Sequence, residues 1–139
     1  MIALDTNILV RAIVAEADAD ATTRAQQQRA MALLSSGKRL FIPLTVAQEV
    51  EWVLRSIYGM PVQDIAAVLQ DLLHTENIET DRAAAVQQAL AGYTNGLDFS
   101  DALHLALAGL CTGMASFDAR FAKRAGRLGL KPSVAAPAG

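Results

Sequence analysis

Two aspartates each follow a short apolar run and precede a helical pattern. Asp5 comes after residues 1–4, and Asp118 ends the run that starts at residue 114. A brief apolar run bounded by turn-forming residues predicts a buried strand. Ligands of open α/β sheets bind beyond the carboxyl ends of the strands, so neighbouring parallel strands, about 4.8 Å apart, would place both carboxylates in one cleft. The alternative is that each aspartate only caps the following helix, a position that Asp favours.

A third acid, Glu49, belongs to a helix predicted over residues 46–58. At about 100° per residue, Glu49 lies on the flank of the apolar stripe, whereas Glu51 falls on the opposite, solvated face. The stripe consists of Val46, Val50, Val53, Leu54 and Ile57. A carboxylate partly removed from water must be paired, protonated or bound to a metal. We therefore interpret Glu49 as a candidate ligand, with an ordinary salt bridge as the alternative, and Glu51 as a residue that serves only solubility.

Asp98 and Asp101 open a helix, predicted over residues 100–110, that is apolar on every side. Their spacing is a capping arrangement, with Asp98 as the N-cap and Asp101 in the first turn. Capping explains Asp98 fully and Asp101 only in part, because the other faces of the helix are apolar. Asp101 is therefore expected to point toward the protein interior or toward a cleft near the start of the helix.

Together, Asp5, Glu49, Asp101 and Asp118 could hold a cation. Gathered carboxylates repel one another and raise each other's pKa unless a cation compensates them. Oxygen ligands without a cysteine cluster or paired histidines select Mg²⁺ or Mn²⁺ over zinc. His104 is solitary and is expected to be a core histidine. A carboxylate-held divalent ion activates water and neutralises a phosphodiester under attack, so hydrolysis of a nucleic-acid backbone is the natural reaction.

A basic face follows Asp118 on the helix predicted over residues 119–128. It consists of Arg120, Lys123, Arg124 and Arg127. Such a face could hold phosphates beside the metal ion. The alternative is an ordinary amphipathic surface helix whose cations suit its carboxyl end.

The elements that must position these residues alternate between strands and helices. Strands are predicted over residues 1–4, 40–42, 76–79, 114–117 and 130–134. Helices are predicted over residues 6–14, 21–34, 46–58, 62–74, 81–91, 100–110 and 119–128. This alternation predicts an α/β fold of three layers, α/β/α, in which helices wrap a short parallel sheet of four to five strands. Residues 1–134 are expected to form a single domain, with a loose tail over residues 135–139.

Length and composition fit a one-domain protein with an aliphatic core. The chain has 139 residues, 53% of them hydrophobic and only 5% aromatic. No apolar run is long enough to span a bilayer and no basic leader precedes the first one, so an unprocessed cytoplasmic protein is expected. The single cysteine, Cys111, is expected to pack in an apolar run. A formal net charge of −2 excludes nucleic-acid binding by bulk charge alone.

Four motifs in order resemble the PIN domain, and within it the VapC-type toxins of bacterial toxin–antitoxin pairs. They are Asp5-Thr-Asn, Glu49 within Val46-Ala-Gln-Glu-Val-Glu-Trp, Asp98-Phe-Ser-Asp-Ala-Leu-His, and Ser116-Phe-Asp-Ala-Arg-Phe. The resemblance implies a Mg²⁺- or Mn²⁺-dependent endoribonuclease whose catalytic metal ligands are Asp5, Glu49, Asp101 and Asp118. It also implies auxiliary roles for Asp98, Thr6, Asn7 and Ser116.

The resemblance further implies a homodimer, a cognate antitoxin that covers the cleft, and a structured RNA such as tRNA as the substrate. One departure is Ala119, where many relatives carry a charged side chain, and this puts substrate contacts at that position in doubt. Two alternatives remain open: a solitary PIN nuclease without an antitoxin, and a non-catalytic α/β interaction module. Haloacid-dehalogenase-like phosphatases do not fit, because they need an acid where Asn7 stands.

Overall fold

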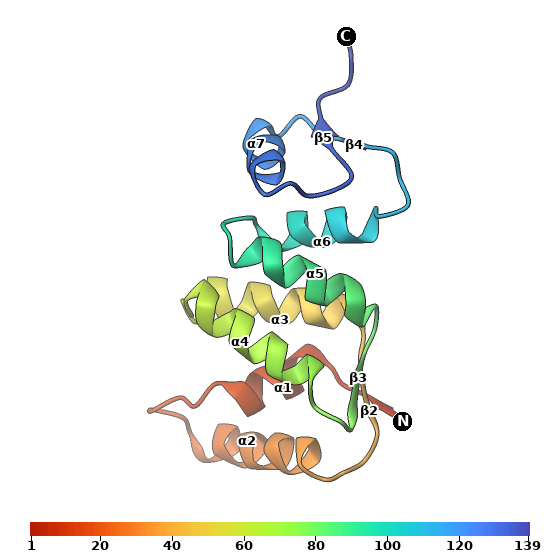
Figure 1. Ribbon diagram of the computed structural model, residues 1–139. Coiled ribbons are helices and arrows are strands. Elements are labelled where there is room, and N and C mark those ends of the chain that lie inside the picture. Colours follow the sequence, from red (N-terminus) through yellow and green to blue (C-terminus); the bar gives the residue numbers. More distant parts are fainter. The chain divides into compact units, whose positions relative to one another are not determined.

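The computed structural model describes residues 1–139 as two compact units, which we describe separately (Figure 1). The N-terminal unit is Met1–Asp81 and the C-terminal unit is Arg82–Gly139. All strand pairs in both units are parallel. Parallel strands joined by helices are the feature that the alternating sequence pattern predicted.

The N-terminal unit has a three-stranded sheet and four helices. Its strands are β1 (Ile2–Ala3), β2 (Leu40–Ile42) and β3 (Ile78–Thr80), in the spatial order β1-β2-β3. Its helices are α1 (Thr6–Ile13), α2 (Ala21–Leu34), α3 (Leu44–Ser56) and α4 (Val62–Leu73). Helix α1 packs against α2 and α3, and α4 packs against α3 and β3. Leu9, Leu40, Val50 and Leu54 are fully buried at the centre of this unit.

The C-terminal unit has three helices and a two-stranded sheet. They are α5 (Ala83–Tyr93), α6 (Phe99–Leu107), β4 (Met114–Ala115), α7 (Ala119–Arg127) and β5 (Val134–Ala135). Helices α5 and α6 pack closely, and the rings of Tyr93 and Phe99 meet edge to face with their centroids 5.2 Å apart. Gly92 lies at this contact, because a Cβ there would lie 3.0 Å from the Leu97 side chain before α6 and 3.5 Å from the Cβ of Ala102 on α6.

The predicted burial of β1 is wrong. The strand is only two residues long, both are exposed, and Ile2 retains 45% of its accessible surface. Because β1 lies at the edge of its sheet, it has a strand neighbour on one side only. Leu4, just beyond the strand, is the residue of this run that enters the core. The predicted burial of the second run, residues 114–117, is wrong as well. Phe117 follows β4 and is 87% exposed.

Helix α6 is also shorter and less enclosed than its sequence suggested. It ends at Leu107, so Leu110 and Cys111 lie beyond it and are exposed, contrary to the expectation of a buried cysteine. His104 is exposed as well, so its prediction as a core histidine is wrong. His104 lies one turn after Asp101 on the same face of the helix. Helix α6 therefore keeps one polar stripe, and Phe99, Ala102, Leu103 and Leu105 are buried on its other faces.

Candidate active site

Three carboxylates line one cavity of about 210 Å³ in the C-terminal unit. We call it the acidic cavity. Its lining residues are Leu97, Asp98, Asp101, Asp118, Arg120, Phe121 and Arg124. They come from the start of α6, the loop before it and the first turns of α7. The structure thus brings together two of the four predicted ligands, Asp101 and Asp118, with Asp98 beside them.

Asp98 and Asp118 are held in place by capping the helices that they precede. Oδ2 of Asp98 accepts a hydrogen bond from the backbone N–H of Asp101 at 3.2 Å, and Oδ1 of Asp118 accepts one from Phe121 at 3.0 Å. The hydroxyl of Ser116 accepts the backbone N–H of Asp118 at 3.1 Å. The capping interpretation of Asp98 is therefore confirmed. Each of the two aspartates commits one carboxylate oxygen to its helix and retains a second one.

Asp101 differs from its neighbours, because its carboxylate caps no helix. It is partly buried and lines the cavity, as expected from its place on an otherwise apolar helix. Burial, followed by repulsion from Asp98 and Asp118, raises the pKa of Asp101 above its ordinary value of 3.8, and His104 opposes this shift. A cation in the cavity would relieve both the desolvation and the repulsion of the ionised form.

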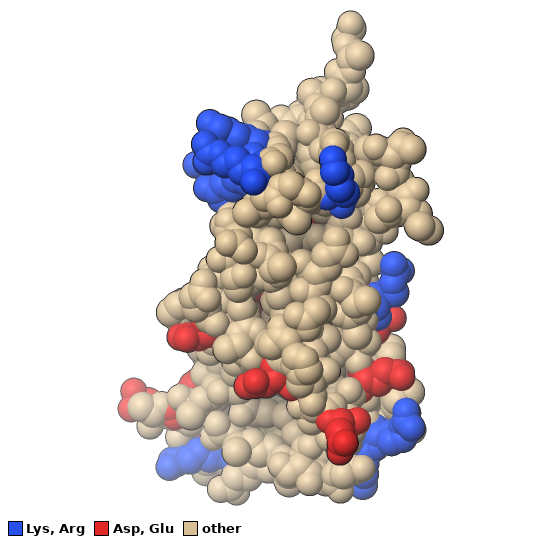
Figure 2. Space-filling model, viewed as in Figure 1, with Lys and Arg blue, Asp and Glu red and all other residues tan.

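The basic face of α7 is exposed, as predicted, and Phe121 and Ala125 are buried on the opposite side. Figure 2 shows Lys and Arg side chains gathered over this helix. Arg124 has a structural role besides, since its Nη1 donates a hydrogen bond to the carbonyl oxygen of Gly96. That bond ties α7 to the loop that leads into Asp98. Arg120 lines the same cavity, and Lys123 and Arg127 lie exposed on the helix.

The first motif, Asp5-Thr-Asn, lies in the N-terminal unit at the start of α1. Asp5 is exposed and caps this helix, with Oδ1 accepting the backbone N–H of Thr6 at 2.8 Å. The hydroxyl of Thr6 is buried and has no hydrogen-bond partner, which leaves one polar atom beside Asp5 available to a further group. Asn7 is exposed and lines a second cavity, described below.

The two glutamates of α3 are arranged differently from their predicted pattern. Glu49 is exposed, whereas Glu51 is only 2% exposed and forms an ion pair with Arg55, with 2.7 Å between Oε2 and Nε. The prediction that Glu51 only serves solubility is therefore wrong. The buried face of α3 consists of Ala47, Val50, Glu51 and Leu54. It is therefore rotated around the helix axis by about one residue, toward Ala47 and Glu51, relative to the apolar stripe predicted from the sequence. An arginine one turn later neutralises Glu51 and lets it occupy the buried face.

Asp81 is an acid that the sequence pattern should have indicated. It directly follows β3, just as Asp5 and Asp118 follow the apolar runs of β1 and β4, but the sequence pattern predicts a helix over residues 81–91. Its Oδ2 accepts the backbone N–H of Leu44 at 3.4 Å, at the start of α3. This contact supplies the cap that Pro43, the N-cap residue of α3, does not provide with its own side chain.

The acidic cavity fits a hard divalent ion in its donor chemistry. Its donors are carboxylate oxygens only, two of the three carboxylates are fixed by caps, and Asp101 accepts no hydrogen bond. In neither unit do three or more His, Cys, Asp or Glu side chains lie close enough together to form a complete ligand set. The assignment of Asp5, Glu49, Asp101 and Asp118 as one ligand set therefore stays a prediction.

Parallel strands, connecting helices and an acidic cavity flanked by arginines define an α/β protein with a site suited to a cation. A family model described as the PIN domain matches residues 2–127, through both units, and the chain belongs to the PIN domain family. This confirms the predicted PIN-type α/β fold class. PIN domains are generally nucleases, that is hydrolases, and generally use divalent metal ions. The comparisons find no match among curated proteins or solved structures.

None of the helices combines the length and the apolar character needed to cross a bilayer.

Proposed function

We propose that this PIN protein is a Mg²⁺- or Mn²⁺-dependent endoribonuclease. The observation that carries the proposal is the acidic cavity, in which Asp98, Asp101 and Asp118 lie beside Arg120 and Arg124. Burial of Asp101 and, after it, repulsion from Asp98 and Asp118 raise the pKa of Asp101, and a cation in the cavity would compensate both effects. Arginines at the rim of an acidic site are suited to an anionic substrate that an ion draws into the site.

The catalytic metal ligands in this proposal are Asp5, Glu49, Asp101 and Asp118. When bound, a divalent ion supplies activation of water and neutralisation of charge on the phosphodiester. Asp118 would be oriented by its cap and by Ser116, and Asp98 would hold the start of α6 as an auxiliary acid. Arg120, Lys123 and Arg127 would contact RNA phosphates and set the register of the substrate. Thr6 and Asn7 would assist Asp5.

The finer assignment that we propose is the toxin of a type II toxin–antitoxin pair. The support is the order of the four motifs, which resembles the VapC-type branch of the family. The proposed partners are a structured RNA such as tRNA as the substrate, a cognate antitoxin protein, and a second copy of the chain in a homodimer. Production of the chain alone should arrest growth, and co-production of a small protein encoded beside it should restore growth. Normal growth in the first case would favour a solitary nuclease.

RNA cleavage tests the enzymatic part of the proposal. Purified protein is incubated with structured RNA in Mg²⁺, in Mn²⁺ and in EDTA, together with the variants Asp101→Asn and Asp64→Asn. Asp64 is an exposed acid on α4 and serves as the control for loss of one charge. Cleavage should need the ion, fall by about 10²- to 10³-fold in Asp101→Asn and persist in Asp64→Asn. Cleavage in EDTA, or none with either ion, would falsify the proposal.

A further inference from the structure

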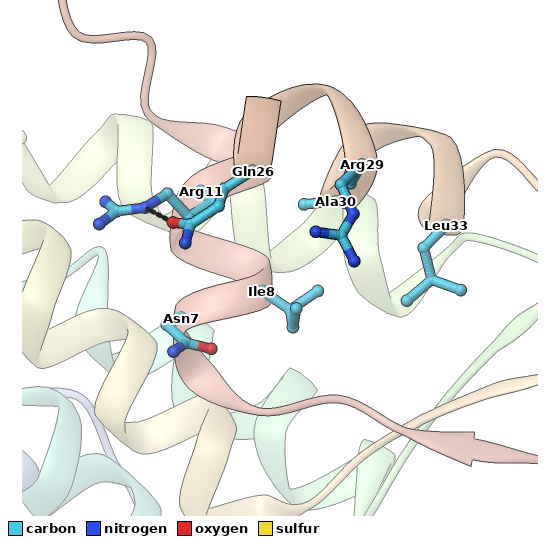
Figure 3. A pocket seen from close by; sticks show the side chains of 7 residues that line it. All are labelled: Asn7, Ile8, Arg11, Gln26, Arg29, Ala30 and Leu33. Atoms are coloured by element: carbon cyan, nitrogen blue, oxygen red, sulfur yellow. Dashed lines mark hydrogen bonds between the residues drawn. The ribbon is translucent and has the colours of Figure 1, made fainter. Parts of the chain in front are cut away.

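A second cavity, of about 330 Å³, lies between α1 and α2 in the N-terminal unit (Figure 3). We call it the basic cavity. Its lining residues are Asn7, Ile8, Arg11, Gln26, Arg29, Ala30 and Leu33. Arg29 and Leu33 extend from α2 toward Ile8 on α1. Its volume is at the lower end of the range for sites that hold small molecules.

The charge of this cavity is positive. Two arginines line it and no acid does. Nε of Arg11 donates a hydrogen bond to Oε1 of Gln26 at 3.1 Å. The charge of Arg11 also interacts electrostatically with Asp20 and Tyr58. Arg29 has neither a hydrogen bond nor an ion pair, so its whole guanidinium fork is available to a ligand. A planar fork of this kind matches the paired oxygens of a phosphate.

The other lining groups match a nucleobase. The side-chain amide of Asn7 and the NH₂ group of Gln26 can serve the polar edge of a base, since amides pair well with base edges. Ile8, Ala30 and Leu33 provide an apolar surface for its flat face. An acidic peptide would use the arginines but would leave the apolar surface and both amides without a specific partner. A nucleotide uses all three kinds of group.

The position of the cavity relates it to the first predicted ligand. Asp5 caps α1, and Asn7 and Arg11 follow on the same helix. At 1.5 Å per residue, Arg11 lies about 9 Å along the axis from Asp5. That is roughly two to three stacked nucleotides at about 3.4 Å each. We propose that the basic cavity binds one nucleotide of the RNA substrate, outside the nucleotides that are cleaved. This inference rests on the proposed ribonuclease function.

Binding measured without cleavage tests this inference. The affinity for a structured RNA is measured in EDTA at several salt concentrations, for the wild type, Arg29→Gln and Arg24→Gln. Arg24 is exposed on the same helix but does not line the cavity, so it is the matched control. Arg29→Gln should weaken binding about 3- to 10-fold and lower the salt slope by about one, because one phosphate contact is lost. Arg24→Gln should change neither quantity.

Arg29→Lys separates a specific fork from a general positive charge. It should restore the salt slope and recover only part of the affinity, since an ammonium cannot pair two phosphate oxygens in one plane. Full recovery of the affinity would contradict the proposed geometry. Circular dichroism and thermal unfolding of each variant check the fold.

The possible failures are distinguishable. A wild type that neither binds nor cleaves RNA overturns the proposed function and this inference together. A wild type that cleaves RNA, with Arg29→Gln binding as Arg24→Gln does, overturns this inference alone. Arg29→Gln could instead bind a polyglutamate peptide more weakly than the wild type does, with its RNA affinity unchanged. That result would also overturn this inference and would assign the cavity to an acidic protein partner.

Discussion

The two units carry opposite charges, and each has a cavity whose character opposes that of its unit. The C-terminal unit has six Lys and Arg against three Asp, a formal charge of +3, and all three Asp line its cavity. The N-terminal unit has six basic and eleven acidic residues, a formal charge of −5, yet its cavity is lined by arginines and no acid. The net charge of −2 hides both facts. Local placement of charge, rather than its sum, therefore indicates where each ligand would bind.

The largest expected effect comes from removing the one acid in the acidic cavity that has no structural duty. Asp101→Asn should lower the rate of RNA cleavage by about 10²- to 10³-fold, the range for loss of one group that stabilises charge at a reacting centre. It should also abolish the rise in melting temperature that Mg²⁺ or Mn²⁺ causes in the wild type. Thermal unfolding with and without the ion measures this. An unchanged response to the ion would contradict the role of Asp101 as a ligand.

A contrasting test concerns the buried acid of the N-terminal unit. Glu51 is 2% exposed and is paired with Arg55, so its charge serves the fold. Arg55→Met should lower the free energy of unfolding by about 1–3 kcal/mol, because a buried carboxylate loses a partner. Glu49→Gln, at an exposed position of the same helix, should change it by less than about 0.5 kcal/mol. Urea unfolding measures both, and equal effects would remove the distinction between the two glutamates.

A smaller effect is expected where α7 is tied to the loop before α6. Arg124→Met removes the hydrogen bond to the Gly96 carbonyl and should weaken binding of Mn²⁺ about 3- to 10-fold, because Asp98 and Asp118 are then held less firmly relative to each other. Arg127→Met removes the same charge from the same helix without touching the cavity. Mn²⁺ titration by calorimetry compares the two. Equal losses would show that only the charge matters.

The smallest effect is a dependence of stability on pH. The pKa of Asp101 is raised above its ordinary value of 3.8, so the folded state holds this proton more tightly than the unfolded state does. Without metal, the contribution of Asp101 to the free energy of unfolding should fall as the pH rises from 3.8 through the raised pKa. Above that range, Asp101→Asn should melt on the order of 1–3 °C higher than the wild type. The two proteins should melt at equal temperatures at about pH 3, below the unfolded-state pKa, and differ at about pH 7. A difference at the lower pH and none at the higher would contradict the cause assigned to the shift.

Elements with local signals were predicted best. The bounds of α2 and β2 agree with the sequence pattern, and Asp118 caps its helix through a hydrogen bond from the backbone N–H of the residue three positions later. A capping contact of this kind depends on a few neighbouring residues, so the sequence is enough to indicate it. The same reasoning identified Asp98 as the cap of α6.

The failures concern burial, which depends on distant parts of the chain. β1 is exposed because it lies at the edge of its sheet, and the sequence of residues 1–4 does not indicate whether a strand is at an edge or in the middle. The wheel of α3 missed Glu51 because neighbouring positions differ by only 100° and Arg55 neutralises the charge. The apolar neighbours of His104 predict a core residue, but His104 is exposed and shares the polar stripe of Asp101.

The double duty of Asp98 and Asp118 affects how related chains should be interpreted. Each starts a helix and also borders the acidic cavity, so a descendant that had abandoned catalysis would still gain from keeping both. Asp101 starts no helix, and burial and repulsion disfavour its charge, so such a lineage would be free to discard it. In a comparison of homologous sequences, the acid at position 101 would therefore distinguish active enzymes from inactive ones better than the acids at positions 98 and 118 would.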